Sequence, residues 1–260
     1  MRTKMKSTHI IPESALLEYI HKEIAGKSFI FYTLSGAHLY GFPSHDSDFD
    51  IRGCHIMDAR EICGLSVPKD FIERMEGDID FVSFDIRKEL GLVLQNNSNV
   101  LEHIFAPPLV TGPPFPHLKK IAGLALSKKV FNPYFGLALF NRKKYLEREN
   151  SASDKASVKI YLYVLRSLMA GMYALEQGRI EPDIRTLNRH FGYPVVDDLI
   201  SIKINGTERG MVGSGREVDA LISQLFSDLE SAKENSRLPD NPPQEVFEMA
   251  NDFLLDCRGV

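Results

Sequence analysis

The chain of 260 residues has no tryptophan and only three cysteines, Cys54, Cys63 and Cys257. These cysteines form no Cys-x-x-Cys pair and have no histidine at the spacing of a zinc site, so we expect free thiols in a reducing compartment. The sequence also lacks an HExxH motif and any serine or cysteine in a nucleophile motif. Nothing therefore points to a zinc protease or to a hydrolase with a covalent intermediate.

Long apolar runs are missing as well. The basic residues near the N-terminus lead only to Ile10-Ile11 before Pro12, which is too short for the apolar core of a signal peptide. The longest candidate run, around Phe135 to Phe140, is far shorter than the roughly 20 residues that a membrane-spanning helix needs. We therefore expect a cytoplasmic protein with no membrane partner.

Acidic residues are scarce in one stretch of a chain whose net charge is −4. Residues 116–166 carry eleven lysines and arginines against three acids, which gives 11 − 3 = +8 there and −12 elsewhere. A segregated basic stretch favours contact with a polyanion, although the same lysines also suit solvated helix faces. Its Asn141-Arg142-Lys143-Lys144 cluster could follow a nucleic-acid backbone, but without interleaved exposed aromatics this signal is generic.

Hydrophobic periodicity predicts an α+β fold, with a small mixed sheet followed by an all-helical part. Strands are expected at 29–34, 49–57 and 80–86, and helices at 12–25, 37–42, 87–95 and from Asn99, where Asn99 and Glu102 resemble a capping box. The proline- and glycine-rich segment 106–114 marks a boundary between domains 1–114 and 115–260. Further helices are expected at 115–129, 133–149, 154–177, 195–203, 217–236 and 244–257.

Asp48-Phe49-Asp50 is the most informative feature present. Both carboxylates point the same way from a strand, with Cα atoms roughly 6.6 Å apart, and repel each other unless a cation lies between them. Mg²⁺ binds through one or two carboxylates together with substrate phosphates. The preceding Ser35-Gly36-Ala37 turn can present N–H groups to phosphates at a helix N-terminus. The combination predicts chemistry on a nucleoside triphosphate, and an acidic loop is the alternative.

The turn followed by Asp-x-Asp resembles the DNA polymerase β-type nucleotidyltransferase pattern. The fuller stretches Ser35–Phe42 and Ser47–Gly53 are similar to a narrower bacterial and phage group, the YcgL/RlaP-like proteins associated with RNA repair. Asn97–Glu102 and Lys159–Arg166 also resemble this group, so the similarity covers about residues 28–170. One position departs from the pattern: the family's serine after the glycine is Ala37 here, which leaves Ser35 or backbone N–H groups to meet the triphosphate.

The resemblance implies a third carboxylate on a neighbouring strand. Asp78, Asp80 and Asp85 compete for this role, and Asp80 is chosen because it lies inside the strand and matches the family's position; a strand-end turn residue is the alternative. Two Mg²⁺ ions, or Mn²⁺, roughly 3.5–4 Å apart would clamp the attacking hydroxyl and the departing pyrophosphate. Asp48 and Asp50 would hold both ions, and Asp80 would hold the acceptor-side ion.

Cations are also needed for the triphosphate. At about 100° per residue, Lys155, Lys159 and Arg166 lie within about 40° of one another on the long apolar helix. Such a buried basic stripe needs an anionic partner, either a triphosphate or acids of the N-terminal domain. Arg52 shares the face of Asp48 and Asp50, where it would contact phosphate or hold a carboxylate.

The predicted function is therefore transfer of a nucleoside monophosphate from a nucleoside triphosphate to a hydroxyl, with RNA as the favoured acceptor. A protein or small-molecule hydroxyl is one alternative, as in nucleotidylating toxins or antibiotic-modifying relatives of the superfamily. A non-catalytic nucleotide- or RNA-binding module on the same fold is the other.

Overall fold

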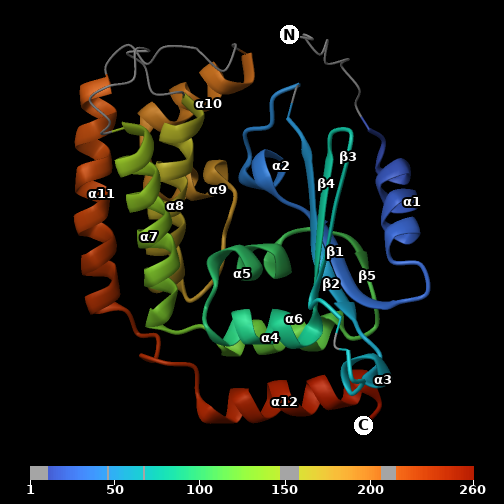
Figure 1. The fold of residues 1–260 in the computed structure, drawn as a ribbon. Coiled ribbons are helices and arrows are strands. Elements are labelled where there is room, and N and C mark those ends of the chain that lie inside the picture. Colours follow the sequence, from blue (N-terminus) through green and yellow to red (C-terminus); the bar gives the residue numbers. More distant parts are fainter. Residues whose placement is uncertain (1–10, 46, 67, 147–157, 206–214) are drawn as a thin grey trace.

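A five-stranded mixed sheet forms the N-terminal half of the protein, in the order β3-β4-β2-β1-β5. The computed structural model describes residues 11–45, 47–66, 68–146, 158–205 and 215–260. The strands are β1 (Ser28–Leu34), β2 (Phe49–Ile56), β3 (Phe71–Glu76), β4 (Ile79–Asp85) and β5 (Pro108–Thr111). β2 and β4 run parallel, whereas every other neighbouring pair is antiparallel. With helices following this sheet, the expected α+β class is confirmed (Figure 1).

The alternation of side chains along β2 gives the sheet two different faces. Ile51 packs on one face with Tyr32 and Phe81 beneath α1 (Glu13–Glu23), whose Leu16 and Ile20 complete this small core. The other face carries Asp50, Arg52 and Cys54 and looks toward the helices. The acidic and basic side chains of β2 therefore lie on the face that the helical half approaches.

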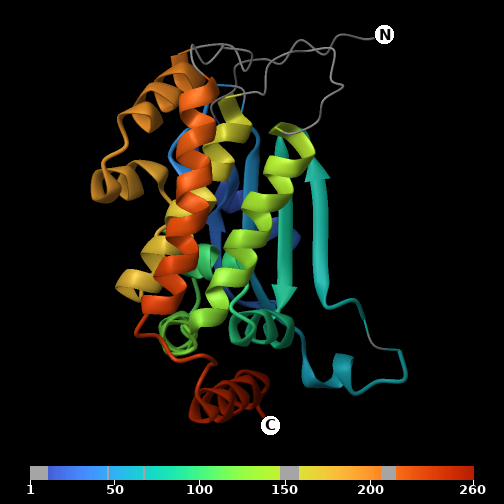
Figure 2. The same ribbon diagram turned by 90° about the vertical axis from the view of Figure 1, so that its left-hand side faces the viewer.

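The remaining helices lie on that second face and beyond it, except α3, which lies below the end of β2 (Figures 1 and 2). They are α2 (Gly36–Tyr40), α3 (Ala59–Ile62), α4 (Ile86–Leu94), α5 (Ser98–Phe105), α6 (Phe115–Leu124), the 3₁₀ turn η1 (Lys128–Val130), α7 (Phe131–Asn141), the π-helical turn η2 (Arg142–Leu146), α8 (Val158–Gln177), α9 (Ile184–Phe191), α10 (Pro194–Asn205), α11 (Gly215–Asn235) and α12 (Gln244–Arg258). One continuous buried core extends from α4 and α5 through α8 to α11 and α12. The helical half therefore shares its core with the sheet.

α8 is the central helix of the molecule. Gly171 lies at its closest packing point, because a Cβ there would stand 2.9 Å from Cβ of Tyr134 on α7 and 3.0 Å from Leu229 on α11. By length and composition alone, α8 could cross a membrane, a possibility that the sequence reading did not raise. However, 78% of its apolar window is buried inside the molecule. Packing within the fold accounts for its apolar character.

Several elements differ from the expectation. β5 lies inside the segment read as a linker and pairs with β1, and an edge strand that begins at Pro108 tolerates the missing N–H. β3 and α9 were not expected; β3 is largely exposed after Phe71 and Ile72, so it lacks a clear apolar alternation. The cap of α5 is Asn97, whose Oδ1 accepts from the Val100 N–H at 3.2 Å, and not Asn99.

Candidate functional site

Asp50 and Asp80 lie directly opposite each other on the parallel strands β2 and β4. Asp48 is exposed just before β2 begins. Burial raises the pKa of Asp50, Arg52 opposes this rise, and the charges of Asp80 and Asp48 add to it. The three predicted acids are thus close enough to influence one another at one end of the sheet.

Arg52 holds the Asp50–Asp80 pair together. Its Nη2 donates to Asp50 Oδ1 at 3.0 Å and to Asp80 Oδ2 at 2.7 Å. Its Nη1 donates to the carbonyls of Asp80 at 2.7 Å and Ile51 at 3.0 Å. Of the two roles left open by the sequence, the structure shows Arg52 tying down carboxylates. All three side chains keep some exposure: 20% for Arg52, 29% for Asp50 and 28% for Asp80.

The glycine of the turn is in contact with the same carboxylate. Gly36 has φ +60°, and a Cβ on it would lie 2.1 Å from Asp50 Oδ2. The backbone N–H of Ser35 donates to the Asp50 carbonyl at 2.7 Å, which anchors the turn to β2. Only glycine allows the turn to approach Asp50 this closely.

The Ser35 hydroxyl has its own partner, the Nε2 atom of His103 on α5, at 2.9 Å. Burial, together with the nearby charges of Arg52 and Arg166, lowers the pKa of His103 to about 3. The imidazole is therefore neutral at physiological pH. The sequence analysis missed His103, because no local pattern relates α5 to the turn 68 residues earlier.

Arg166 forms a second, fully buried ion pair behind the turn. Its Nη1 lies 2.7 Å from Glu102 Oε1, with side-chain exposures of 1% and 0%. The guanidinium also lies 3.6 Å from the ring centroid of Tyr40 on α2. The expectation that Arg166 faces a triphosphate is therefore corrected: its partner is an acid of the N-terminal half, the alternative that the sequence left open. Glu102 likewise has a role other than helix capping.

The rest of the proposed basic stripe is only partly described. Lys159 is half-buried in the first turn of α8, and Lys155 lies outside the described residues. One turn further along, Tyr163 packs edge-on against Tyr40 and Phe42, with centroids 5.7 and 5.5 Å apart. Burial raises the pKa of Tyr163; Arg166 opposes this rise and Asp50 adds to it. α8 thus brings side chains toward the carboxylate cluster.

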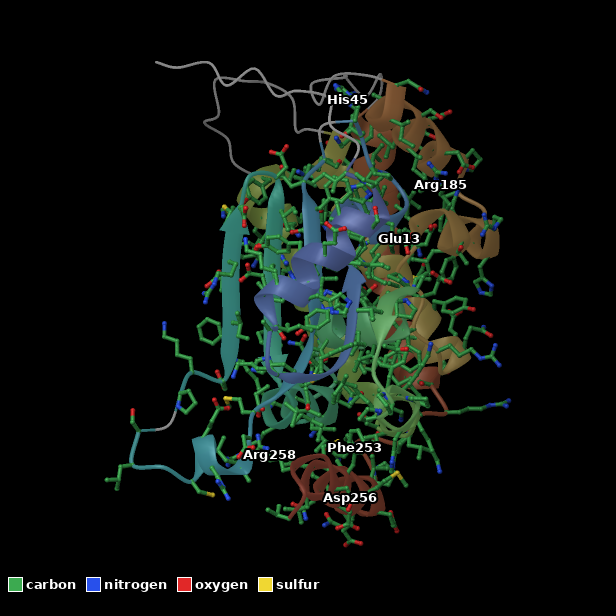
Figure 3. The ribbon with its side chains drawn as sticks, turned by 90° about the vertical axis from the view of Figure 1, so that its right-hand side faces the viewer. Glu13, His45, Arg185, Phe253, Asp256 and Arg258 are labelled. Carbon is green, nitrogen blue, oxygen red and sulfur yellow. The ribbon has the colours of Figure 1, made fainter. Side chains whose placement is uncertain are left out.

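The other acids considered for the third position lie elsewhere. Asp78 is exposed before β4, and its carbonyl accepts from the Phe49 N–H at 2.8 Å. Asp85 caps α4 at the opposite end of β4 and lies 2.5 Å from Arg258 of α12, beneath the sheet (Figure 3). Of the three acids that competed, only Asp80 stands beside Asp50.

The donors suit a hard cation in kind, since carboxylate oxygens are the ligands of Mg²⁺. Nevertheless, within the described ranges no group of three or more histidine, cysteine, aspartate or glutamate side chains is arranged to hold a metal ion. Arg52 stands between Asp50 and Asp80, the position that an ion shared by both would take. The donor chemistry of the site suits a metal, and the guanidinium of Arg52 occupies the place between the two carboxylates.

Comparison with known proteins matches residues 12–256 to a family model described as RlaP, RNA repair pathway DNA polymerase beta family. The uncharacterized protein MJ0002 of Methanocaldococcus jannaschii is 29% identical over 224 residues, which cover 83% of this chain and 88% of that protein. The uncharacterized protein YcgL of Bacillus subtilis is 27% identical over 164 residues, 60% of each chain. No solved structure matches the chain.

Proposed function

Because the chain belongs to the RNA repair pathway DNA polymerase beta family, we propose that it is a metal-dependent nucleotidyltransferase acting on RNA. It would move a nucleoside monophosphate from a nucleoside triphosphate to an acceptor hydroxyl and release pyrophosphate. The observation that carries this proposal is the placement of Asp80 opposite Asp50, with Gly36 packed against the Asp50 carboxylate. Family membership alone supports the nucleotidyltransferase class; the metal and the RNA acceptor are part of the proposal.

The roles of the residues follow from their positions. Asp48, Asp50 and Asp80 would hold Mg²⁺, which when bound neutralises charge on the triphosphate and at the α-phosphorus. The Ser35–Gly36 turn fixes the Asp50 backbone, and the Glu102–Arg166 pair joins α5 to α8 behind that turn. The chain's own contribution is thus mainly positioning, as expected for phosphoryl transfer.

The test is transfer of label from each α-labelled nucleoside triphosphate, with Mg²⁺ or Mn²⁺ and a pool of RNA or cell extract. We expect label on RNA with the wild type and loss of at least about a hundredfold with Asp50→Asn or Asp80→Asn, because positioned charge contributes several kcal/mol. Asp78→Asn is the matched control, since it removes the same charge from an exposed residue just before β4.

The same experiment identifies the acceptor, because the label marks the molecule that receives the nucleotide. Label on protein or on a small molecule, still dependent on Asp50, would replace RNA as the acceptor and keep the transferase. Nucleotide binding without transfer to any acceptor and without pyrophosphate release would overturn the enzymatic proposal in favour of a binding module.

A further inference from the structure

Two exposed aromatic rings stand among lysines where α7 ends in η2. Phe140 is 56% exposed and Tyr145 is 44% exposed, and Lys143 and Lys144 between them are also exposed. The Lys144 ammonium lies 5.1 Å from the Phe140 ring centroid and 4.8 Å from that of Tyr145. We call these four residues the aromatic–lysine patch.

The segment of α7 and η2 that carries the patch is basic. Residues 131–146 contain three basic residues and no acid. Arg142 is turned inward: its guanidinium lies 5.5 Å from the Phe226 ring of α11, and its Nη2 lies 3.3 Å from Ser223 Oγ. Arg142 therefore secures η2 to α11, which leaves the two lysines and two rings on the surface.

We infer that the aromatic–lysine patch is a platform for single-stranded RNA, on which bases stack on Phe140 and Tyr145 while Lys143 and Lys144 meet phosphates. Single-strand binding sites combine positive charge with aromatic faces. The exposure of Phe140 and Tyr145 corrects the expectation that this basic cluster lacks exposed aromatics. The inference rests on the proposed function, because it places the acceptor RNA of that reaction.

The location of the patch suits an acceptor strand. The C-terminal end of α7 and the beginnings of β2 and β4, which carry Asp50 and Asp80, lie at the same end of the molecule (Figures 1 and 2). RNA held on the patch therefore lies at the end of the molecule where its terminal hydroxyl would react.

The test measures binding of a fluorescently labelled single-stranded RNA oligonucleotide to the full-length protein by anisotropy at several salt concentrations. Phe140→Ala/Tyr145→Ala should weaken binding at least about tenfold, because one base–aromatic stack contributes roughly 1–3 kcal/mol, and should leave the salt dependence unchanged. Lys143→Ala/Lys144→Ala should lower the slope of log affinity against log salt by about 1.4, for two phosphate contacts. Phe247→Ala, at a ring 41% exposed on α12, is the matched control.

Equal binding by Phe140→Ala/Tyr145→Ala and Phe247→Ala would overturn the inference, as would no binding of RNA by the wild type. Thermal melting confirms that each variant is folded, and pyrophosphate release reports the nucleotidyl chemistry separately. Asp50-dependent release together with unaltered RNA binding by the patch variants would leave the proposed function standing and remove only the platform. Loss of capture of a protein acceptor, with RNA binding unaffected, would assign the patch to a protein partner instead.

Discussion

Two of the protein's arginine–carboxylate clusters differ mainly in their exposure to water. Arg52 bridges Asp50 and Asp80 with every side chain at least 20% exposed, whereas Arg166 and Glu102 are almost completely buried. The buried pair lies where α5, α2 and α8 meet, and the open pair lies at the end of the sheet. The same chemical interaction thus serves packing in one place and remains accessible to a ligand in the other.

The surroundings explain the difference. Burial disfavours the charge on Arg166, but Glu102 and Tyr40 raise its pKa overall, so the guanidinium stays charged. Glu102 Oε2 and Arg166 Nε have no hydrogen-bond partner among the described residues, so the pair depends on its one short contact. Charges buried in this way are strongly destabilising if one partner is removed, whereas half-exposed charges are stabilised by water.

Glu102→Gln should produce the largest loss of stability. It leaves the Arg166 charge buried without a counter-charge, which costs about 3–5 kcal/mol. The free energy of unfolding, measured by urea denaturation, reports the change. The double variant Glu102→Leu/Arg166→Met, which removes both charges, should recover most of the loss. If the double variant loses as much unfolding free energy as Glu102→Leu and Arg166→Met together, the two charges are not coupled. The contrast between the buried and the exposed cluster would then not hold.

Glu89 extends the comparison, because it is a carboxylate 2% exposed whose pKa is shifted by burial alone. Burial raises its pKa to about 8 from an ordinary value of 4.5. The folded state therefore holds a proton that the unfolded state releases, so stability is full below pH 4.5 and falls as pH rises toward 8. Glu89→Gln should stabilise the protein by about 3 kcal/mol at pH 7 and have little effect at pH 4.

Urea denaturation at several pH values measures the effect of Glu89→Gln. The matched control is Glu73→Gln, which replaces an exposed glutamate of β3 and should give no pH-dependent gain. Equal pH profiles for the wild type and Glu89→Gln would show that Glu89 is ionised in the folded protein.

The sequence predicted the parts of the site that local pattern determines. The apolar run before Ser35 and the Asp48–Asp50 spacing identified β1, β2 and the acids of β2, since side-chain alternation is a local property. Asp80 followed from the resemblance and from its place within a strand. For Arg52 the sequence left phosphate contact and holding a carboxylate open, because its bridge between Asp50 and Asp80 depends on the register between β2 and β4.

Long-range contacts were the main source of error. Glu102 and Arg166 are 64 residues apart, and the helical stripe alone favoured a triphosphate over an acid of the N-terminal domain as the partner of Arg166. β5 looked like a linker because its pairing with β1 is a tertiary interaction that overrides the proline and glycine signals around it. Sequence periodicity predicts elements well and predicts their partners poorly.

Gly36→Ala should disturb the open cluster, which is formed by Arg52, Asp50 and Asp80, more than it destabilises the fold. The left-handed backbone at Gly36 costs alanine about 1–2 kcal/mol, and the new Cβ, 2.1 Å from Asp50 Oδ2, forces that carboxylate to move. We therefore expect a modest loss of stability and a large loss of label transfer. Gly26→Ala is the matched control, because Gly26 has φ +77° with no atom within 4 Å of a Cβ. Equal activity of the two variants would show that the Gly36–Asp50 contact is dispensable.

Arg52→Gln should have the smallest effect on stability, under about 1 kcal/mol, because partly exposed ion pairs contribute little. The same substitution should strengthen the binding of a divalent metal ion. Without the guanidinium, Asp50 and Asp80 face each other with no cation between them, so a divalent ion should bind more tightly. The measurement is Mn²⁺ affinity by electron paramagnetic resonance without nucleotide, where we expect at least about a tenfold gain for an interaction of 1.4 kcal/mol or more.

Two further variants decide the origin of that gain. Arg74→Gln removes an exposed arginine of β3, paired with Glu23 at 3.5 Å, and should leave Mn²⁺ affinity unchanged. Adding Asp80→Asn to Arg52→Gln should abolish the gain, because a shared ion needs both carboxylates. If Arg52→Gln binds Mn²⁺ no better than the wild type, Arg52 does not compete with a metal. The open cluster would then resemble the buried pair in being a permanent structural contact, and accessibility would no longer distinguish the two.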